Sequence, residues 1–290
     1  MHTTLRSASR EVVIGHDQPF CLIGERINPT GRRIFQEQLR AGDLSAIERD
    51  VAAQVAGGAT MLDVNMGVPL TDEPALLANA IKLVQSLTDL PICIDSSVVE
   101  ALEAGLAAYE GRALVNSVTA EDERMELILP LVKRYDAAVI ALPNDEFEIP
   151  MEADRRLELV GHIVDVATGR YGIAIEDILI DPLAMPIGAD TKVVATTLET
   201  ISRIRAEFGL NMCLGASNVS FGMPGRHTLG ATFLPMAMSH GLTSAIMDTR
   251  SEQIVQGVKA ADLLLGNDEW GMNWIAAHRA REASSNASSG

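Results

Sequence analysis

The 290-residue sequence contains little of what marks several common classes of protein. Aromatic residues make up only 4% of the chain, and cysteine occurs three times, at Cys21, Cys93 and Cys213. Each cysteine lies inside an apolar run, and we interpret all three as reduced core residues, which is typical of a cytoplasmic protein. No apolar stretch approaches 18 residues, so we expect no membrane-spanning helix.

Motifs for metals, dinucleotides and nucleic acids are also missing. Without CxxC, HExxH or a His–Cys cluster, the sequence predicts no metal site in this chain. No GxGxxG follows the first apolar run, which disfavours an open dinucleotide-binding sheet. The formal net charge of −16 argues against a nucleic acid as the main partner. Any bound anion is therefore expected to be held by local groups.

The sequence does contain eight apolar runs that each end in an acid or an amide. A buried strand gains nothing from Asp or Asn, because an unpaired polar group there costs a few kcal/mol. Hydrophobic residues make up 47% of the chain, which leaves ample material for one large α/β domain. The runs cover residues 21–28, 60–67, 91–97, 113–119, 137–145, 178–184, 212–220 and 244–250.

Segments with helical spacing separate the runs. They cover residues 45–59, 73–87, 97–109, 121–135, 154–171, 192–208, 232–241 and 251–266. Ser97 and Glu100 form a predicted capping box, and Ser251 is a weaker predicted cap. Strand and helix alternating eight times predict a parallel sheet that closes into a (β/α)8 TIM barrel, with an open doubly wound sheet as the alternative.

We interpret the chain as one barrel domain over residues 20–281. Residues 1–19 are then an N-terminal extension, and residues 282–290 a disordered tail. The carboxyl ends of all barrel strands face one side, so Asp63, Asp95, Asn116, Asp181 and Asn218 are expected to line one pocket. Any one of them alone could be a helix cap or a turn residue, as we interpret Asp72.

A pocket of carboxylates and amides with little positive charge suits a neutral, flat ligand that offers several N–H donors. It suits a phosphate poorly, because anions are held by Lys, Arg or helix N-termini. The sequence of the pocket residues therefore predicts recognition by multiple hydrogen bonds.

Six motifs of the chain resemble those of the pterin-binding methyltransferase family, in the same order and at similar spacing from about Cys21 to Leu265. This family includes the methyltetrahydrofolate–corrinoid protein methyltransferases and the folate module of cobalamin-dependent methionine synthase. The motifs are IGERINPTGRR (23–33), LDVNMG (62–67), CIDSS (93–97), VNSVT (115–119), IDPLAMP (180–186) and LGASNVSFGMPGR (214–226).

The resemblance implies roles for particular residues. Residues matching Asp95, Asn116 and Asp181 hydrogen-bond the pterin of methyltetrahydrofolate, and the one matching Asn218 reaches its N5 region. The methyl group then passes from N5 to the cob(I)alamin of a separate corrinoid protein. The predicted pterin-binding set also includes Asp63, Asn65, Glu25 and Arg226, although Glu25 could be an ion-pair partner and Arg226 could equally fix its loop.

The reaction requires electrophilic help at N5, because a tertiary amine is a poor leaving group until it gains a proton or a strong hydrogen bond. Asn218 does not titrate, so we expect it to act through water and nearby carboxylates, with Asp181 and Asp63 as candidates. The predicted catalytic residues are Asn218 and Asp181. By the same resemblance, the enzyme is expected to be a homodimer, and its cysteine usage predicts a cytoplasmic location.

Three alternatives remain at this point. Dihydropteroate synthase shares the barrel but needs a lysine for its pyrophosphate, and no Lys occurs between Lys192 and Lys259. The chain could instead be the folate-binding subunit of a split methionine synthase, since it has neither a DxHxxG cobalamin motif nor a homocysteine-binding cysteine cluster. Acid–base chemistry on a sugar by Asp63 and Asp95 is disfavoured by the scarcity of aromatic residues.

Overall fold

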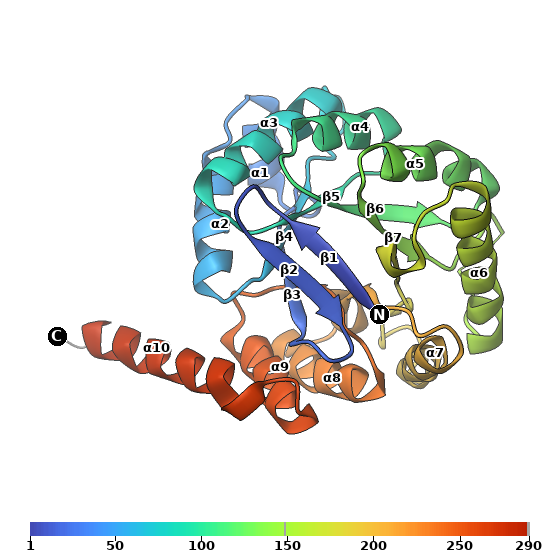
Figure 1. Cartoon of the computed structure of the whole chain (residues 1–290). Helices are drawn as coiled ribbons and strands as arrows, with labels where there is room; N and C mark the ends of the chain where they lie inside the picture. The colour runs from blue at the N-terminus through green and yellow to red at the C-terminus, as the bar shows by residue number, and fades with distance from the viewer. Residues whose placement is uncertain (148, 289–290) are drawn as a thin grey trace.

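Eight predicted apolar runs form one parallel β-sheet in the computed structural model, which describes residues 1–147 and 149–288, with side chains up to residue 282. The strands follow the order β8-β7-β6-β5-β4-β3-β10-β9, and a parallel bridge between Ile180 and Met212 joins the two outer strands. The predicted TIM barrel is therefore confirmed (Figure 1). Its strands are β3 (Cys21–Ile27), β4 (Met61–Asn65), β5 (Ile92–Asp95), β6 (Leu114–Thr119), β7 (Ala138–Leu142), β8 (Ile178–Ile180), β9 (Cys213–Gly215) and β10 (Ser244–Met247).

Helices surround the barrel and bury apolar side chains against the sheet, except for α10, which projects away from it. In α3 (Glu73–Leu87), for example, Leu77, Ile81 and Val84 are fully buried. The other helices are α1 (Arg33–Arg40), α2 (Ser45–Ala56), α4 (Val99–Ala108), α5 (Asp122–Arg134), α6 (Ala153–Asp165), α7 (Val193–Glu207), α8 (Arg226–His240), α9 (Glu252–Leu265) and α10 (Met272–Ser288). Short helical turns are η1 (Val166–Arg170), η2 (Ile175–Asp177), η3 (Ala216–Ser220) and η4 (Glu269–Gly271).

The predicted helix caps are partly wrong. The capping box at Ser97 does not form, because the hydroxyl of Ser96 accepts the N–H of Val98 and α4 begins two residues later than predicted. Ser251 stands at the N-cap of α9, but its side chain makes no cap hydrogen bond. Asp72 does cap α3, accepting the N–H of Ala75 at 3.1 Å, as predicted.

Helix α8 is longer than its apolar pattern indicates. It begins at Arg226, six residues before the predicted start, and it includes Pro235. The polar first turn was interpreted as part of the preceding motif, whereas in the structure it already has helical geometry. This extension carries Arg226 on the first turn of the helix, beside the barrel mouth.

The hydrophobic core has two layers. One lies between the sheet and the helices, and the other fills the inside of the barrel. All three cysteines belong to the inner layer, where they are free and buried, so their interpretation as core residues is confirmed. Small and medium side chains fill this interior, consistent with the low aromatic content of the chain.

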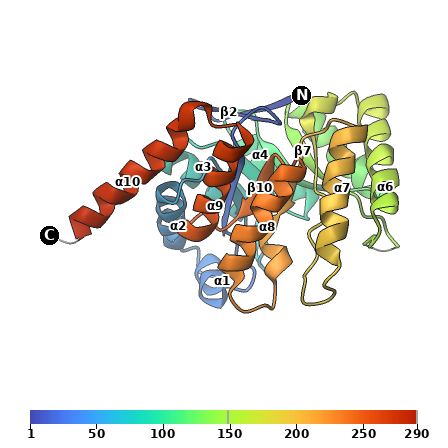
Figure 2. The ribbon, with the colours of Figure 1, turned by 90° about the horizontal axis from the view of Figure 1, so that it is seen from below.

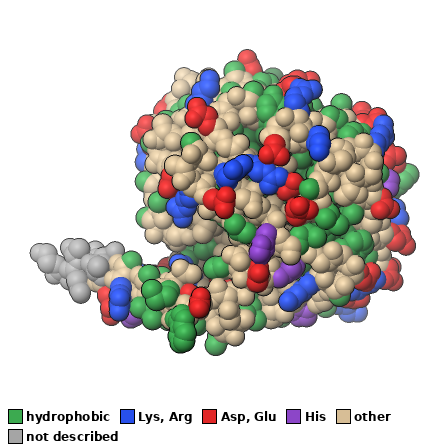
Figure 3. Space-filling view, viewed as in Figure 1, with side chains coloured by type: hydrophobic (Ala, Val, Ile, Leu, Met, Phe, Trp, Pro, Cys, Tyr) green, Lys and Arg blue, Asp and Glu red, His purple; other side chains and the backbone are tan. Residues whose placement is uncertain are grey.

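The N-terminal residues form an antiparallel hairpin of β1 (His2–Arg6) and β2 (Glu11–Gly15). Leu5 and Ile14 are fully buried within the inner core layer, so the hairpin covers the end of the barrel where the strands begin. Figure 2 shows the hairpin on the side opposite α1 and the loops of the mouth. On the hairpin face, acidic and basic side chains alternate without a large field of one charge (Figure 3).

Helix α10 projects away from the barrel (Figures 1 and 2). Residues 283–290 make up most of the predicted disordered tail. Their side chains lie outside the part of the chain that the structure describes. No described helix is both long enough and apolar enough to pass through a membrane.

Candidate active site

The barrel brings the predicted polar residues to one rim. Asp63, Asn65, Asp95 and Asn116 lie on the strands β4, β5 and β6, and Asp181 follows β8 directly. Strand register places Asn65 opposite Asp95, and Asp95 opposite Asn116, so these three residues form one level across three neighbouring strands. A parallel sheet presents residues at the same level on the same side. The row therefore lies side by side at the mouth.

Hydrogen bonds within this row and to neighbouring residues fix the orientation of its two amide side chains. The Nδ2 of Asn65 donates to Asp95 Oδ2 at 3.0 Å, and the Nδ2 of Asn116 donates to Asp63 Oδ1 at 3.2 Å. The Oδ1 of Asn65 accepts the N–H of Gly67 at 2.8 Å. Because the amide nitrogen of Asn116 is used below, its Oδ1 remains as an acceptor for a ligand.

The carboxylates of the mouth titrate abnormally because they are removed from water. Burial raises the pKa of Asp95 to about 6, with Asn65 opposing and Glu73 adding to the shift. Burial raises the pKa of Asp181 to about 6 as well, although the backbone N–H groups of Leu183 and Gly215 favour its ionised form.

Asp63 lies deepest, with 1% of its surface exposed. Burial, followed by the charge of Asp95, raises its pKa well above the ordinary value. Two carboxyl groups so close disfavour double ionisation, so we assign the proton of this pair to Asp63 and the charge to Asp95. Asp63 then forms the floor of the site, under Asn116.

Asn218 lies in η3, directly after β9, and is exposed to solvent. Gly215 is next to it, and a Cβ on Gly215 would lie 3.0 Å from Asn218 Nδ2. The N–H of Gly215 also bonds Asp181. Gly215 thus lies between the two predicted catalytic residues and lets their side chains share one side of the mouth.

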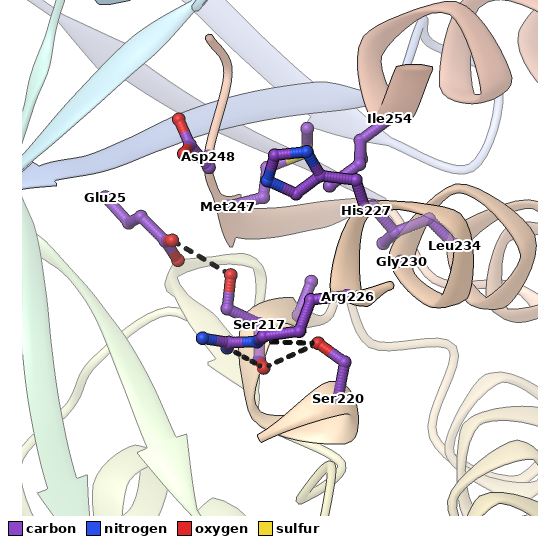
Figure 4. A pocket seen from close by; sticks show the side chains of 11 residues that line it. Glu25, Ser217, Ser220, Arg226, His227, Gly230, Leu234, Met247, Asp248 and Ile254 are labelled. Atoms are coloured by element: carbon purple, nitrogen blue, oxygen red, sulfur yellow. Dashed lines mark hydrogen bonds between the residues drawn. The ribbon is translucent and has the colours of Figure 1, made fainter. Parts of the chain in front are cut away.

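Glu25 and Arg226 face a small cavity of about 90 Å³ at the edge of the mouth (Figure 4). The Oε1 of Glu25 accepts the hydroxyl of Ser217 at 2.9 Å, and burial raises the pKa of Glu25. Arg226 donates from Nη2 to the carbonyl of Ser217 at 2.8 Å and from Nε to Ser220 Oγ at 3.2 Å. Arg226 therefore fixes the loop after β9.

Two further polar residues at the mouth were not selected from the sequence. Asp248 follows β10 and lines the cavity. Burial acts to raise its pKa, but three hydrogen bonds from Arg250, two from the guanidinium and one from the backbone N–H, outweigh it and lower the pKa. The sequence could have identified Asp248, because it ends the eighth apolar run just as the other acids end theirs. Arg156 was missed because it occupies an apolar stripe of α6 with Leu159, Val160 and Ile163.

Among the described residues, no three His, Cys, Asp or Glu side chains are placed to share a metal ion. The mouth offers carboxylate and amide groups instead. Its arrangement can hold a flat heterocycle through several N–H donors at once and can keep one charged carboxylate at the ring edge.

The fold and this lining define the class. The family described as pterin binding enzyme matches residues 24–248, and the chain belongs to this family. It is 31% identical to the methylcorrinoid:tetrahydrofolate methyltransferase of Eubacterium limosum over 253 residues, covering 85% of this chain and 92% of that protein. The resemblance stated from the motifs is confirmed.

A second relative is the methionine synthase of Mycobacterium tuberculosis, with 32% identity over 249 residues. The match covers 81% of this chain but only 21% of that protein, so this chain spans about a fifth of it. Among solved structures, the dihydropteroate synthase of Xanthomonas albilineans with 7,8-dihydropteroate has a TM-score of 0.68 at 20% identity, covering 90% of this chain and 98% of that one. At this identity the likeness supports the shared fold alone.

Proposed function

We propose that the chain is a methyltransferase that moves the N5 methyl group of methyltetrahydrofolate to or from the cob(I)alamin of a corrinoid protein. The row of Asn65, Asp95 and Asn116 at one level, with its amides held in place, is the observation that carries this proposal. A reduced pterin offers an amino and an amide N–H edge that such a row can bind. The similarity over nearly the whole of a methylcorrinoid:tetrahydrofolate methyltransferase supports the same chemistry.

In this proposal, Asp95, Asn116 and Asp181 bind the pterin, with Asp63 and Asn65 holding the first two in place. Asn218 lies toward N5 and stabilises its protonated form through water and Asp181. The cobalt of cob(I)alamin is itself the nucleophile, so the chain contributes orientation and help at N5. Cobalamin enters on the partner.

Exposed apolar side chains surround the mouth and suit the docking of that partner. The five connecting segments after β3, β4, β5, β7 and β9 each carry at least one, which after β3 lies in α1. We call them the apolar rim: Ile34, Leu70, Val98, Phe147, Ile149, Met151 and Phe221. Leu70 is 102% exposed and Phe147 is 83% exposed, which is unusual unless another surface covers them. A corrinoid-carrying domain seated there would bring its cobalt over the pterin.

A folate-binding subunit of a split methionine synthase is the second candidate, favoured by the 32% identity to methionine synthase over a fifth of its length. Dihydropteroate synthase is disfavoured, because the loop after β9 lies in a stretch without Lys, between Lys192 and Lys259, and so has no lysine to neutralise a pyrophosphate.

The test is transfer between methyltetrahydrofolate and free cob(I)alamin, observed as loss of the cob(I)alamin absorbance. Enzyme-dependent methylcobalamin and tetrahydrofolate are expected. Tight binding of methyltetrahydrofolate without transfer, with either free or protein-bound corrinoid, would favour the passive subunit. Formation of pteroate from a pterin pyrophosphate and p-aminobenzoate would instead identify a synthase.

A further inference from the structure

Arg156 is a fully buried arginine that ties together two loops of the mouth. It lies on the first turns of α6 with 0% of its surface exposed. Its Nε donates to the carbonyl of Pro150 at 2.9 Å, in the loop between β7 and α6. Its Nη1 donates to the carbonyls of Pro182 at 2.8 Å and Leu183 at 3.1 Å, in the loop after β8. One guanidinium thus serves three backbone acceptors on two loops that are far apart in the sequence.

The positive charge of Arg156 has no ion-pair partner among the described residues. Its Nη2 is buried and finds no acceptor there. Removing an unpaired guanidinium from water is costly, so carbonyl contacts alone explain its retention poorly. Burial lowers the pKa of Arg156, and the one carboxylate whose charge opposes this effect is Asp181.

Asp181 is joined to Arg156 through a strained turn. The Oδ1 of Asp181 accepts the N–H of Leu183 at 2.7 Å. Leu183 has a φ of 62°, a left-handed conformation that is unfavourable for a side chain of this kind. Its carbonyl is held from two directions, by Arg156 and by the hydroxyl of Thr197 at 3.0 Å. What fixes Leu183 therefore also fixes the carboxylate two residues before it.

We propose that Arg156 is the positioning residue for Asp181. Its fork holds the turn from Asp181 to Leu183, and its buried positive charge stabilises the carboxylate that faces the ligand. This inference rests on the proposed function only in assigning Asp181 to pterin binding. The same arginine joins the loop after β7 to the loop after β8, so both sides of the mouth near Asp181 are set by one side chain.

The experiment compares Arg156→Met, which removes the charge, with Arg156→Lys, which keeps the charge and loses the fork. Arg170→Met is the matched control, because Arg170 is exposed at the end of the same helical segment and pairs with Glu126 at 2.9 Å. Affinity for 5-methyltetrahydrofolate is measured from about pH 5 to 8.5 in the wild-type and Asp181→Asn backgrounds. In Arg156→Met, the acid midpoint of binding is expected to rise by about 0.5 to 1 pH unit.

In the Asp181→Asn background, Arg156→Met is expected to leave the pH profile unchanged. Arg156→Lys is expected to keep the midpoint and to weaken binding about threefold to tenfold at high pH, because an ammonium cannot span three carbonyls. A shift of equal size in both backgrounds, or no shift at all, would overturn the proposal. If Arg156→Met does not fold, Arg156→Gln replaces it, because glutamine also removes the positive charge.

A ligand-free measurement separates this inference from the proposed function. NMR follows the titration of the side-chain carboxyl carbon of Asp181 and so reports its ionisation directly. The signal is assigned to Asp181 because it is missing from the spectrum of Asp181→Asn. The titration is expected to move to higher pH in Arg156→Met and to stay in place in Arg170→Met. An unmoved Asp181 titration refutes the role of Arg156 even if the wild type binds the folate. A wild type that does not bind the folate refutes the proposed function alone.

Discussion

At the scale of the residue, the carboxylates of the mouth serve ligand binding at the expense of folding. Asp63, Asp95 and Asp181 all have pKa values raised by burial. For each, the neutral form is favoured in the folded state. Its contribution to stability is therefore present below the unfolded pKa near 3.8 and is lost as pH rises through the folded pKa. The ionised form that accepts ligand N–H groups is thus the form that folding disfavours.

Asp95→Asn should therefore stabilise the ligand-free protein at pH 7 by about 1–2 kcal/mol, because a neutral amide avoids the buried charge and the repulsion from Glu73. The gain should shrink as pH falls below the folded pKa of about 6 and disappear near the unfolded value of 3.8, where Asp95 is protonated in both states. Urea denaturation at several pH values measures it. A gain of the same size at pH 4.5 and pH 7.5 would show that the charge of Asp95 is not its cause. Pterin binding should be weaker in this variant.

Asn218→Ala should lower methyl transfer about 100-fold while weakening methyltetrahydrofolate binding by less than about fivefold, because the amide acts mainly when N5 becomes positive. Single-turnover transfer and equilibrium binding measure the two effects. Asn144→Ala, in the loop after β7, serves as a control amide for which neither effect is expected. Equal losses in transfer and in binding would leave Asn218 a binding residue only.

At the scale of the element, the N-terminal hairpin closes the barrel end opposite the mouth. Leu5→Ala should destabilise the protein by about 2–4 kcal/mol, because it opens a cavity inside the inner core layer. Glu11→Ala, on the same hairpin and exposed, should change stability by less than about 0.5 kcal/mol. Denaturant unfolding compares the two. The affinity for methyltetrahydrofolate should be unchanged in both variants. If Leu5→Ala binds the folate more weakly at a temperature where it is folded, the hairpin end and the mouth of the barrel are not independent.

At the scale of the whole molecule, the apolar rim contrasts with a chain of net charge −16. Leu70→Asp combined with Phe221→Asp should raise the KM for a protein-bound corrinoid at least about tenfold, because both side chains are exposed on mouth loops. Transfer to free cob(I)alamin should change less than about twofold. Leu264→Asp, equally exposed but at the end of α9, is the control. Equal losses with free and protein-bound corrinoid would place the effect in the site itself.

The sequence by itself determined the order of strands and helices and which polar residues lie at the barrel mouth. Strand ends are readable because an apolar run that stops at an acid has a local signature, and eight repeats allow the sheet to close into a barrel. The bridge between Ile180 and Met212 in the structure decided between this barrel and an open sheet. Asp95, Asn116 and Asp181, which we propose bind the pterin, were found as residues of the mouth in this way. Helix starts such as that of α4 were less readable, because Ser96 and Ser97 offer equivalent caps until Glu73 engages Ser96 in the fold.

Only the tertiary structure decided which polar groups contact each other. The bond from Asn116 to Asp63 joins residues 53 positions apart, and Ser217 bonds Glu25 across 192 positions. The sequence of α6 does not show what Arg156 contacts, and only the folded chain makes it the buried link between two mouth loops. The physical reason is that strand-end polarity is local, whereas burial, and with it the raised pKa values and the unpaired charge, exists only once distant segments exclude water together.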